Sequence, residues 1–404
     1  MAQRLIAEIN LDNILFNYRQ VLKCAPDCRV CCVVKANAYG HGAVPVARVL
    51  AQAGADFFAV ATPEEALQLR RHGISQDILL LCPADADWVE VLAAQRISLT
   101  VGSIETARIY AKAAKGAQLK IHIKLDTGMT RLGLPYQGAV ENILAIARWP
   151  NFIIDGLFTH FSVADEDTII IAKDGKRREG LFAPSSTKDK GDNDFTNVQL
   201  SRFQTINKEL RTHNIDIPLV HCACSAALIA YPHSQGTMVR PGIMLYGSNP
   251  LGNHPLTLKP ALTLKARVAQ VSRILKGESV GYGRNWFATR DSVIATVSLG
   301  YADGLTRLLS GKLPMLIHGR EARQVGRICM DMCMLDITEI PQVVAGDYVT
   351  IIGRQQTLAI TADQIAQAAG TITHEVLCAI GLRVPRLYYQ SGQLVEQINY
   401  LDQL

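Results

Sequence analysis

Between residues 30 and 245, short apolar runs alternate with longer amphipathic stretches, and this alternation restricts the fold more than any other feature. The apolar runs are almost continuous, which is typical of parallel strands covered on both faces. The stretches between them carry helix signals. In the stretch at 62–73, Thr62 is the expected N-cap, Pro63 the first helical residue and Gly73 the stop. Eight strands alternating with helices predict a (β/α)8 TIM-type barrel. Its strands are expected at 30–35, 56–61, 78–82, 97–102, 119–126, 152–161, 217–225 and 237–245.

The pattern changes after about residue 250. Segments such as "SVIATVSLGYADG" and "DYVTIIG" are rich in β-forming residues and are joined by glycine or charged turns. The sequence therefore predicts an α/β barrel followed by a mainly β C-terminal domain. With a boundary near 252–255, the two domains are expected at 1–250 and 251–404.

Composition narrows the classes of protein and of partner. Hydrophobic residues make up 49% of the chain and charged residues 19%, enough apolar surface for a large core. Because the net charge of +5 is small and the basic residues are scattered, we expect no nucleic-acid partner. No apolar run approaches the roughly 20 residues that span a bilayer, and the N-terminus lacks the apolar core of a secretory signal. We therefore expect a cytoplasmic protein without a membrane partner.

The ten cysteines do not have the spacing of a metal site. Most of them lie inside apolar runs, and no CxxC pair or zinc-type Cys/His pattern occurs. We expect reduced, structural thiols and no bound metal. One polar segment, residues 172–195, is expected to be a solvated loop; its place after a barrel strand also fits a lid or a subunit contact.

Several polar residues fall at or near the carboxyl ends of the expected strands: Lys35, Arg131, His160, Ser225 and Arg240. Taken singly, each also fits a structural role, such as a hydrogen-bonded core histidine or a serine cap. In barrels of this type, however, the strand ends converge on the active site, and the loops after the last two strands often bind phosphate. An amine beside a phosphate site indicates pyridoxal 5′-phosphate (PLP) held by Lys35, with the cofactor acting as an electron sink.

At this point the chain resembles the bacterial alanine racemases. The resemblance rests on seven segments in order: "VVKANAYGHG", "LDTGMTRLG", "GLFTHFSVAD", "VRPGIMLYG", "SLGYADG", "GRICMDM" and "RVPR". It implies a PLP-carrying barrel, a C-terminal β domain and a head-to-tail homodimer with active sites shared across the interface. The implied activity is that of an isomerase on alanine, which supplies D-alanine for peptidoglycan or serves D-alanine breakdown.

The resemblance also implies residue roles. Lys35 resembles the PLP lysine and the base on the D face of the substrate, and Tyr301 resembles the opposite base, delivered by the partner subunit. His160 resembles the residue packed against the PLP ring. Arg240 resembles the partner of the pyridine nitrogen; since arginine only donates, that nitrogen would stay unprotonated, which limits side reactions such as transamination.

The remaining positions implied by the resemblance bind the cofactor phosphate or the substrate. The phosphate contacts are expected from Tyr39 and Ser225 and from the backbone of Gly242 and Ile243. The substrate carboxylate is expected to meet Arg131 and the backbone of Met330. Lys124 matches a position that is carbamylated in some relatives, where it would orient Arg131.

Two departures from the family pattern stand out. Leu382, just before "RVPR", replaces a tyrosine that often touches the phosphate, which puts cofactor affinity and substrate range in doubt. The insert at 172–195 is longer than the family's usual loop.

Other functions fit less well. A PLP-dependent amino-acid decarboxylase would carry an acid in place of Arg240 and would not account for Tyr301. A non-catalytic PLP-binding protein would consist of the barrel alone, without the β domain after residue 250. A serine-preferring or broadly specific racemase stays open, because the side-chain pocket cannot be sized from sequence.

Overall fold

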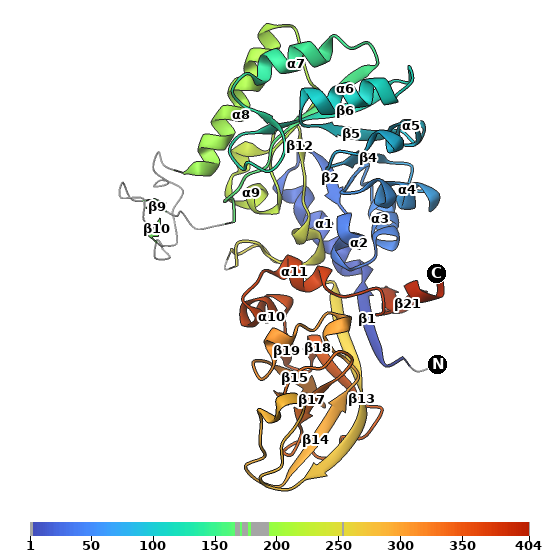
Figure 1. Ribbon diagram of the computed structural model, residues 1–404, viewed down its shortest axis with the longest axis vertical. Helices are drawn as coiled ribbons and strands as arrows, with labels where there is room; N and C mark the ends of the chain where they lie inside the picture. Colours follow the sequence, from blue (N-terminus) through green and yellow to red (C-terminus); the bar gives the residue numbers. More distant parts are fainter. Residues whose placement is uncertain (1–2, 166–169, 172–176, 179–193, 253, 404) are drawn as a thin grey trace.

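The computed structural model describes residues 3–165, 170–171, 177–178, 194–252 and 254–403. Its long axis runs from a helix-covered barrel at one end to a β-sheet at the other (Figure 1). The insert predicted at 172–195 lies almost wholly outside the described residues. The two-residue strand β9 (Ile170–Ile171), just before the insert, pairs antiparallel with β10 (Arg177–Arg178), which lies within it.

The barrel expected from the sequence is confirmed. Its strands pair in parallel in the order β11-β8-β6-β5-β4-β3-β2-β12. A parallel bridge between Cys224 and Arg240 lies beside the two end strands and nearly closes the ring. The strands are β2 (Arg29–Val33), β3 (Phe57–Val60), β4 (Asp77–Leu80), β5 (Ile97–Val101), β6 (Leu119–Asp126), β8 (Phe152–Phe158), β11 (Leu219–His221) and β12 (Met238–Val239). The two-residue strand β7 (Leu134–Pro135) pairs with β6 off this path.

Helices cover the outside of the barrel (Figure 1). Helix α4 begins as the sequence predicts, with Thr62 as N-cap, Pro63 at the first helical position and Glu65 completing a capping box. The other helices of this part are α1 (Leu11–Cys24), α3 (Ala43–Gln52), α5 (Ala86–Ala94), α6 (Ile104–Ala113), α7 (Ala139–Ala147), α8 (Phe195–Thr212) and α9 (Ser225–Ala230), and α4 spans Pro63–Arg71.

The last two barrel strands are shorter than the sequence predicted. The expected strand at 237–245 is limited to β12, because Pro241 has no N–H to donate and Ile243–Tyr246 form the 3-10 helix η2. The expected strand at 217–225 ends at His221, so Ser225 opens α9 rather than closing a strand. Ser225 and Arg240, which were predicted on these two strands, still lie at the carboxyl end of the barrel.

The second part of the molecule is a ten-stranded, mainly antiparallel sheet, as expected for a β C-terminal domain. Strand β1 (Leu5–Asn10) joins this sheet, between β13 on one side and β20, in parallel, on the other. The remaining strands are β13 (Leu262–Ile274), β14 (Ser292–Val297), β15 (Pro314–Ile317), β16 (Arg320–Val325), β17 (Cys333–Asp336), β18 (Tyr348–Gln355), β19 (Leu358–Ile360), β20 (Arg386–Gln390) and β21 (Gln393–Ile398). Helices α10 (Ala362–Ala369) and α11 (Thr373–Cys378) lie between the sheet and the barrel in Figure 1.

The C-terminal part contacts the barrel through a fully buried arginine, Arg386. Its guanidinium donates to the carbonyl of Gly40 at 3.2 Å and to that of Ile380, after α11, at 2.6 Å. Because breaking hydrogen bonds of a buried charge is costly, this contact fixes the two parts against each other.

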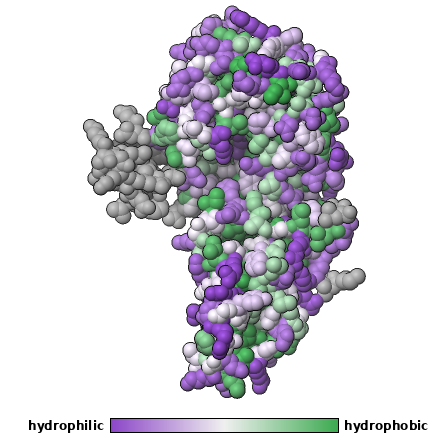
Figure 2. Space-filling view, in the orientation of Figure 1, coloured by the Kyte–Doolittle hydropathy of each residue, from purple (hydrophilic) through white to green (hydrophobic). Residues whose placement is uncertain are grey.

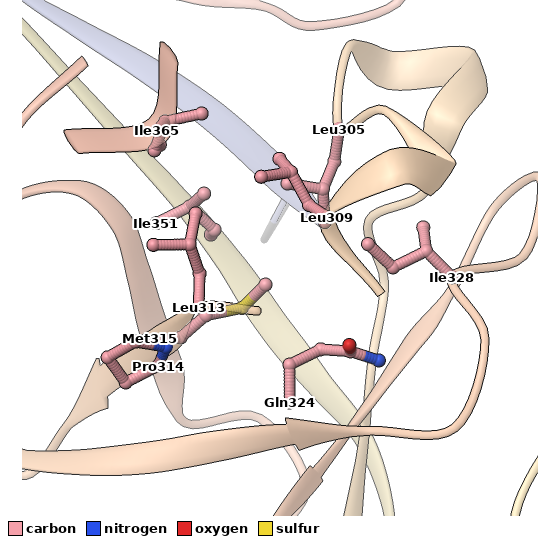
Figure 3. A pocket seen from close by; sticks show the side chains of 9 residues that line it. All are labelled: Leu305, Leu309, Leu313, Pro314, Met315, Gln324, Ile328, Ile351 and Ile365. Carbon is pink, nitrogen blue, oxygen red and sulfur yellow. The ribbon is translucent and has the colours of Figure 1, made fainter. Parts of the chain in front are cut away.

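The core of the C-terminal part encloses an apolar hollow (Figure 3). Its free space is roughly 10 Å³, about the room of one water molecule, so it is a packing defect rather than a ligand site. On the face drawn in Figure 2, hydrophobic and hydrophilic residues are intermixed over both parts. Within the described ranges, no helix has the length and apolar character needed to cross a membrane.

Candidate active site

The mouth at the carboxyl end of the barrel collects the residues that the sequence singled out. Lys35 follows β2, Lys124 lies near the end of β6, His160 follows β8 and Arg240 follows β12. Burial lowers the pKa of His160 well below its usual range, and the charges of Arg240, Lys124, Arg131 and Lys35 lower it further, in that order. These four basic side chains and burial therefore keep His160 neutral.

Lys35 stands at the start of an unusual turn. The segment α2 (Lys35–Tyr39) contains four successive non-glycine residues in the left-handed region, Ala36–Tyr39, with φ of 52–53°. Each such residue costs about 1–2 kcal/mol relative to a right-handed conformation. Strain of this kind persists only where surrounding contacts hold it, and it concentrates at functional sites.

Arg240 is buried and anchored by five hydrogen bonds from its two terminal nitrogens, the longest of them to Nδ1 of His160 at 3.4 Å. One nitrogen donates to Nδ1 of His221 at 2.7 Å and to the His221 carbonyl at 2.8 Å. The other donates to the carbonyls of Thr159 at 2.7 Å and Cys222 at 3.3 Å. In the described part of the chain, no acceptor contacts its Nε, so this N–H remains available to a ligand in the mouth.

The arginine also orders a pair of buried histidines. Since arginine only donates, Nδ1 of His221 must accept, and its proton must sit on Nε2. Nε2 of His221 lies 2.9 Å from Nδ1 of His122, which must then accept in turn. The remaining proton of His122, on Nε2, faces Asp155 at 3.9 Å. Burial lowers the pKa of both histidines, that of His122 to about 3, so both rings are neutral and the positive charge stays on Arg240.

A group of polar atoms suited to an anion lies after β11 and β12. The hydroxyl of Ser225 accepts from the backbone N–H of Gly242 at 2.9 Å and from that of Met244 at 3.4 Å. Ile243 begins η2, so its N–H is one of the unpaired first N–H groups of that helix. A Cβ on Gly242 would lie 2.4 Å from the hydroxyl oxygen of Tyr39, so glycine keeps this space open.

These observations fit PLP. Backbone N–H groups, the Ser225 hydroxyl and the Tyr39 hydroxyl provide the donors that a phosphate monoester needs. The free Nε–H of Arg240 is a suitable partner for the ring nitrogen, and Lys35 provides the amine. The residues predicted from the sequence to hold the cofactor lie at this one mouth, and their individual contacts with the cofactor stay a prediction.

Lys124 and Arg131 flank the same mouth. The ammonium of Lys124 donates to the Leu125 carbonyl at 2.7 Å. Burial lowers the pKa of Lys124 to about 7, and the charges of Arg240 and Arg131 contribute. Near neutral pH, much of Lys124 is thus an uncharged amine. Arg131 is exposed, and the described residues provide no hydrogen-bond or ion-pair partner for its guanidinium.

Tyr301 and Met330 lie together in the C-terminal part. The backbone N–H of Tyr301 donates to the carbonyl of Cys329 at 3.0 Å, and that of Ala302 donates to the carbonyl of Met330 at 3.0 Å. The side chain of Tyr301 is 42% exposed and, among the described residues, contacts none of the barrel groups through a hydrogen bond or a ring contact. Within one chain, the described contacts therefore do not bring the predicted bases Lys35 and Tyr301 together.

Three residues of this region were not found from the sequence: His122, His221 and Glu65, whose Oε1 accepts from the backbone N–H of Ala36, next to Lys35, at 2.5 Å. The signal for His122 was present in "LKIHIKLD", where polar residues alternate with apolar ones and so share one face of the strand. His221 lies in the run "PLVHC", where an isolated polar residue gives no more than a weak signal. Glu65 was hidden by its ordinary place in a helix cap.

A (β/α)8 barrel whose mouth holds a lysine, a buried donor-only arginine and a turn with donors suited to a phosphate fits the class of PLP-dependent barrel enzymes. Comparison with known proteins narrows this class. Residues 9–250 match the family described as alanine racemase, N-terminal domain, and residues 261–388 match alanine racemase, C-terminal domain. The chain belongs to the alanine racemase family.

Individual relatives agree over the full length. Alanine racemase 1 of Clostridium acetobutylicum is 42% identical over 401 residues, which cover 98% of each chain. The alanine racemase of Bacillus anthracis, whose crystal structure is described with bound L-Ala-P, is 33% identical in sequence. Its TM-score is 0.89, and the match covers all of both chains. The alanine racemase of Bartonella henselae, described with covalently bound pyridoxal phosphate, is 30% identical with a TM-score of 0.81, covering 96% of this chain and all of that one.

Proposed function

We propose that this protein interconverts L-alanine and D-alanine with PLP, using Lys35 and Tyr301 as the two bases. The observation that carries the proposal is the convergence of Lys35, the free Nε–H of Arg240 and the Ser225–Gly242 phosphate-binding turn in one barrel mouth. When bound, the cofactor supplies an electron sink for the electron pair left by the departing α-proton.

The proposed roles follow from what each side chain can do. Racemisation needs a proton removed from one face of the α-carbon and another delivered to the opposite face, so two bases are required. Lys35 takes or returns the proton on the D face, and Tyr301 does so on the L face. The Arg131 guanidinium and the backbone N–H of Met330 hold the substrate carboxylate.

The neighbours of the cofactor steer the reaction toward racemisation. Arg240 is fixed by His221 and the carbonyls around it. It donates a hydrogen bond to the ring nitrogen but does not transfer a proton to it. This favours a racemase over a decarboxylase, which would place an acid there. The phosphate is held by Tyr39, Ser225, Gly242 and Ile243, and His160 packs against the ring. Together with Lys35 and Arg240, these residues are the proposed cofactor contacts.

A homodimer is part of the proposal. Tyr301 is exposed and Met330 is 53% exposed, so both can meet the barrel mouth of a second copy. On this account residues 1–250 bind the cofactor and residues 251–404 provide the opposite base, although β1 pairs within the second part's sheet. A cytoplasmic location, with D-alanine destined for peptidoglycan, is included in the proposal; the ten free cysteines support a reducing compartment.

Carbamylation of Lys124 is also proposed. The reaction joins the neutral amine to CO2 and releases one proton, and the lowered pKa of Lys124 provides the neutral amine. The resulting carbamate would place a negative charge near Arg131 and orient its guanidinium.

The test is to incubate the PLP-loaded protein with L-alanine in D2O while following the α-proton by NMR and the hand of alanine by optical rotation. Exchange together with formation of D-alanine is the expected result. Exchange without inversion would mean that one base alone works, which would remove Tyr301 from the mechanism. With neither, the alanine proposal fails, and serine and lysine would be tried in the same assay.

A further inference from the structure

The backbone N–H of Ala36, the residue after Lys35, lies at the start of the left-handed turn and faces the beginning of α4. There it donates to Oε1 of Glu65 at 2.5 Å. The other oxygen of Glu65, Oε2, accepts from the backbone N–H groups of Ala61 at 2.8 Å and Thr62 at 3.3 Å. One carboxylate therefore joins the start of α4 to the first left-handed residue beside the lysine.

A helix cap alone does not require a carboxylate at this position. The chain contains a second capping box at α10, where Gln364 takes the place that Glu65 has in α4. The amide oxygen of Gln364 accepts from the N–H of Thr361 at 2.8 Å, and the N–H of Gln364 donates to the Thr361 hydroxyl at 3.1 Å. One acceptor oxygen is thus enough for the cap. The second acceptor oxygen of Glu65 serves the Lys35 turn.

Other contacts hold the rest of the same turn. Oδ1 of Asn37 accepts from the N–H of Ala43 at 2.8 Å, and the carbonyl of Gly40 accepts from Arg386 at 3.2 Å. Across the described residues, Glu65 is the acceptor found for the Ala36 N–H. It is therefore the side-chain contact that restrains the turn at the end nearest the lysine, beside the backbone bond from the Ala38 N–H to the Val34 carbonyl at 2.9 Å.

We propose that Glu65 is a positioning residue for Lys35 and acts through the backbone N–H of Ala36. The inference rests on the proposed role of Lys35 as cofactor lysine and base. By fixing the first left-handed residue, the carboxylate sets the direction in which the chain presents Lys35 to the mouth. Because both carboxylate oxygens of Glu65 accept from backbone N–H groups, its loss displaces the Lys35 amine without removing a reacting group.

The decisive variant is Glu65→Gln. It keeps the size of the side chain and, as Gln364 demonstrates, the ability to cap a helix. Its single amide oxygen can serve either the cap or Ala36; on the cap side it meets two N–H groups, which leaves an NH2 group facing the Ala36 N–H. Thr62→Ala is the matched control, because it removes the cap hydroxyl and leaves the contact between Glu65 and Ala36 intact.

Three measurements on the PLP-loaded protein separate the two roles of Glu65. We expect Glu65→Gln to speed hydrogen exchange at Ala36, to shift the pH at which the absorbance of the Lys35-bound cofactor changes, and to lower kcat about tenfold with KM within about threefold. Thr62→Ala should lower the unfolding temperature and leave all three readouts near those of the unmodified protein.

Two results would overturn the positioning role. One is unchanged exchange at Ala36 and unchanged absorbance titration in Glu65→Gln. The other is that Thr62→Ala produces the same changes in proportion to its loss of stability, which would assign them to the helix cap. If the unmodified protein does not racemise alanine, the proposed function fails, but hydrogen exchange and absorbance still decide the role of Glu65.

Discussion

The guanidinium of Arg240 donates to Nδ1 of His221 at 2.7 Å, and this contact fixes the protonation of the barrel interior. His221 is forced to carry its proton on Nε2 and to donate toward His122. The two rings are kept neutral by burial and by the charge of Arg240. Arg240 therefore keeps its positive charge at the mouth, and the neutral rings of His221 and His122 behind it do not take up a proton.

Two buried neutral histidines make the protein sensitive to acid: His122 of this pair, and His41, which contacts the carbonyls of Ala38 and Tyr39. The pKa of His122 is lowered to about 3 and that of His41 to about 4, each mainly by burial, whereas an unfolded histidine titrates near 6.5. Each group therefore stabilises the fold fully above about pH 6.5, and this stability is lost as the pH falls toward the folded-state value. We expect each to lower the free energy of unfolding by about 1 kcal/mol per pH unit below about pH 6.

Urea unfolding at several pH values and constant protein concentration measures that slope. His122→Asn is the matched variant, because its amide oxygen can accept from His221 near the position of Nδ1 and cannot be protonated. Its slope should be smaller than that of the unmodified protein by about 1 kcal/mol per pH unit. Equal slopes for the two proteins would contradict the assignment of His122 as a neutral buried group.

Bicarbonate should modify Lys124. Because the pKa of Lys124 is lowered to about 7, its reactive neutral fraction rises as the pH increases through about 7. We expect a carbamate signal in 13C NMR with labelled bicarbonate that grows over this range and disappears in Lys124→Arg.

Lys120→Arg is the control for this modification. Lys120 lies on the same strand, β6, but it is exposed and ion-paired with Asp155 at 3.8 Å. The carbamate signal should survive this substitution. A signal that is lost in Lys120→Arg and kept in Lys124→Arg would show that Lys120 is modified, which would contradict the proposal.

Leu382 offers a test of the phosphate site. It is 54% exposed and stands where the family resemblance implies a phosphate-contacting tyrosine. Leu382→Tyr would add a hydroxyl donor, and one charge-assisted hydrogen bond should tighten PLP binding about tenfold. Leu382→Phe adds the ring without the donor and should leave the dissociation constant of PLP within about twofold. Equal tightening in both variants would attribute the gain to the ring.

Tyr301→Phe should keep PLP bound and lose most racemisation. Removing a general acid–base group typically costs about 10²–10⁴ in rate, and the loss should depend on the hand of the starting alanine. Rates from L- and D-alanine, together with the cofactor absorbance, measure this. Tyr282→Phe, a change at another exposed tyrosine of the same part, should leave both rates within about threefold. Normal rates in both directions for Tyr301→Phe would exclude it as a base.

The barrel was predictable because its strands are buried on both faces and read as continuous apolar runs. Pairing between distant segments was not. β1 lies between β13 and β20, and nothing in its six residues indicates that they join a sheet formed mostly after residue 260. The short eighth strand could have been anticipated from Pro241, which cannot continue a hydrogen-bonded ladder.

The site was predictable where a polar residue ends an apolar run, as Lys35 does, or interrupts one, as Arg240 does. The conformation of the turn after Lys35 was not, because alanine has no preference for the left-handed region. Contacts from elsewhere impose that conformation, among them the carboxylate of Glu65. A side chain that acts through another residue's backbone leaves no motif of its own.

On the proposed function, each active site combines Lys35 of one chain with Tyr301 of another. The decisive measurement mixes equal amounts of Lys35→Ala and Tyr301→Phe chains, each of which alone has lost most racemisation, under conditions that exchange subunits. Random reassociation gives mixed dimers with one intact and one doubly defective site, so about a quarter of the original activity should return. No recovery in mixed dimers demonstrated by mass spectrometry would contradict a shared site.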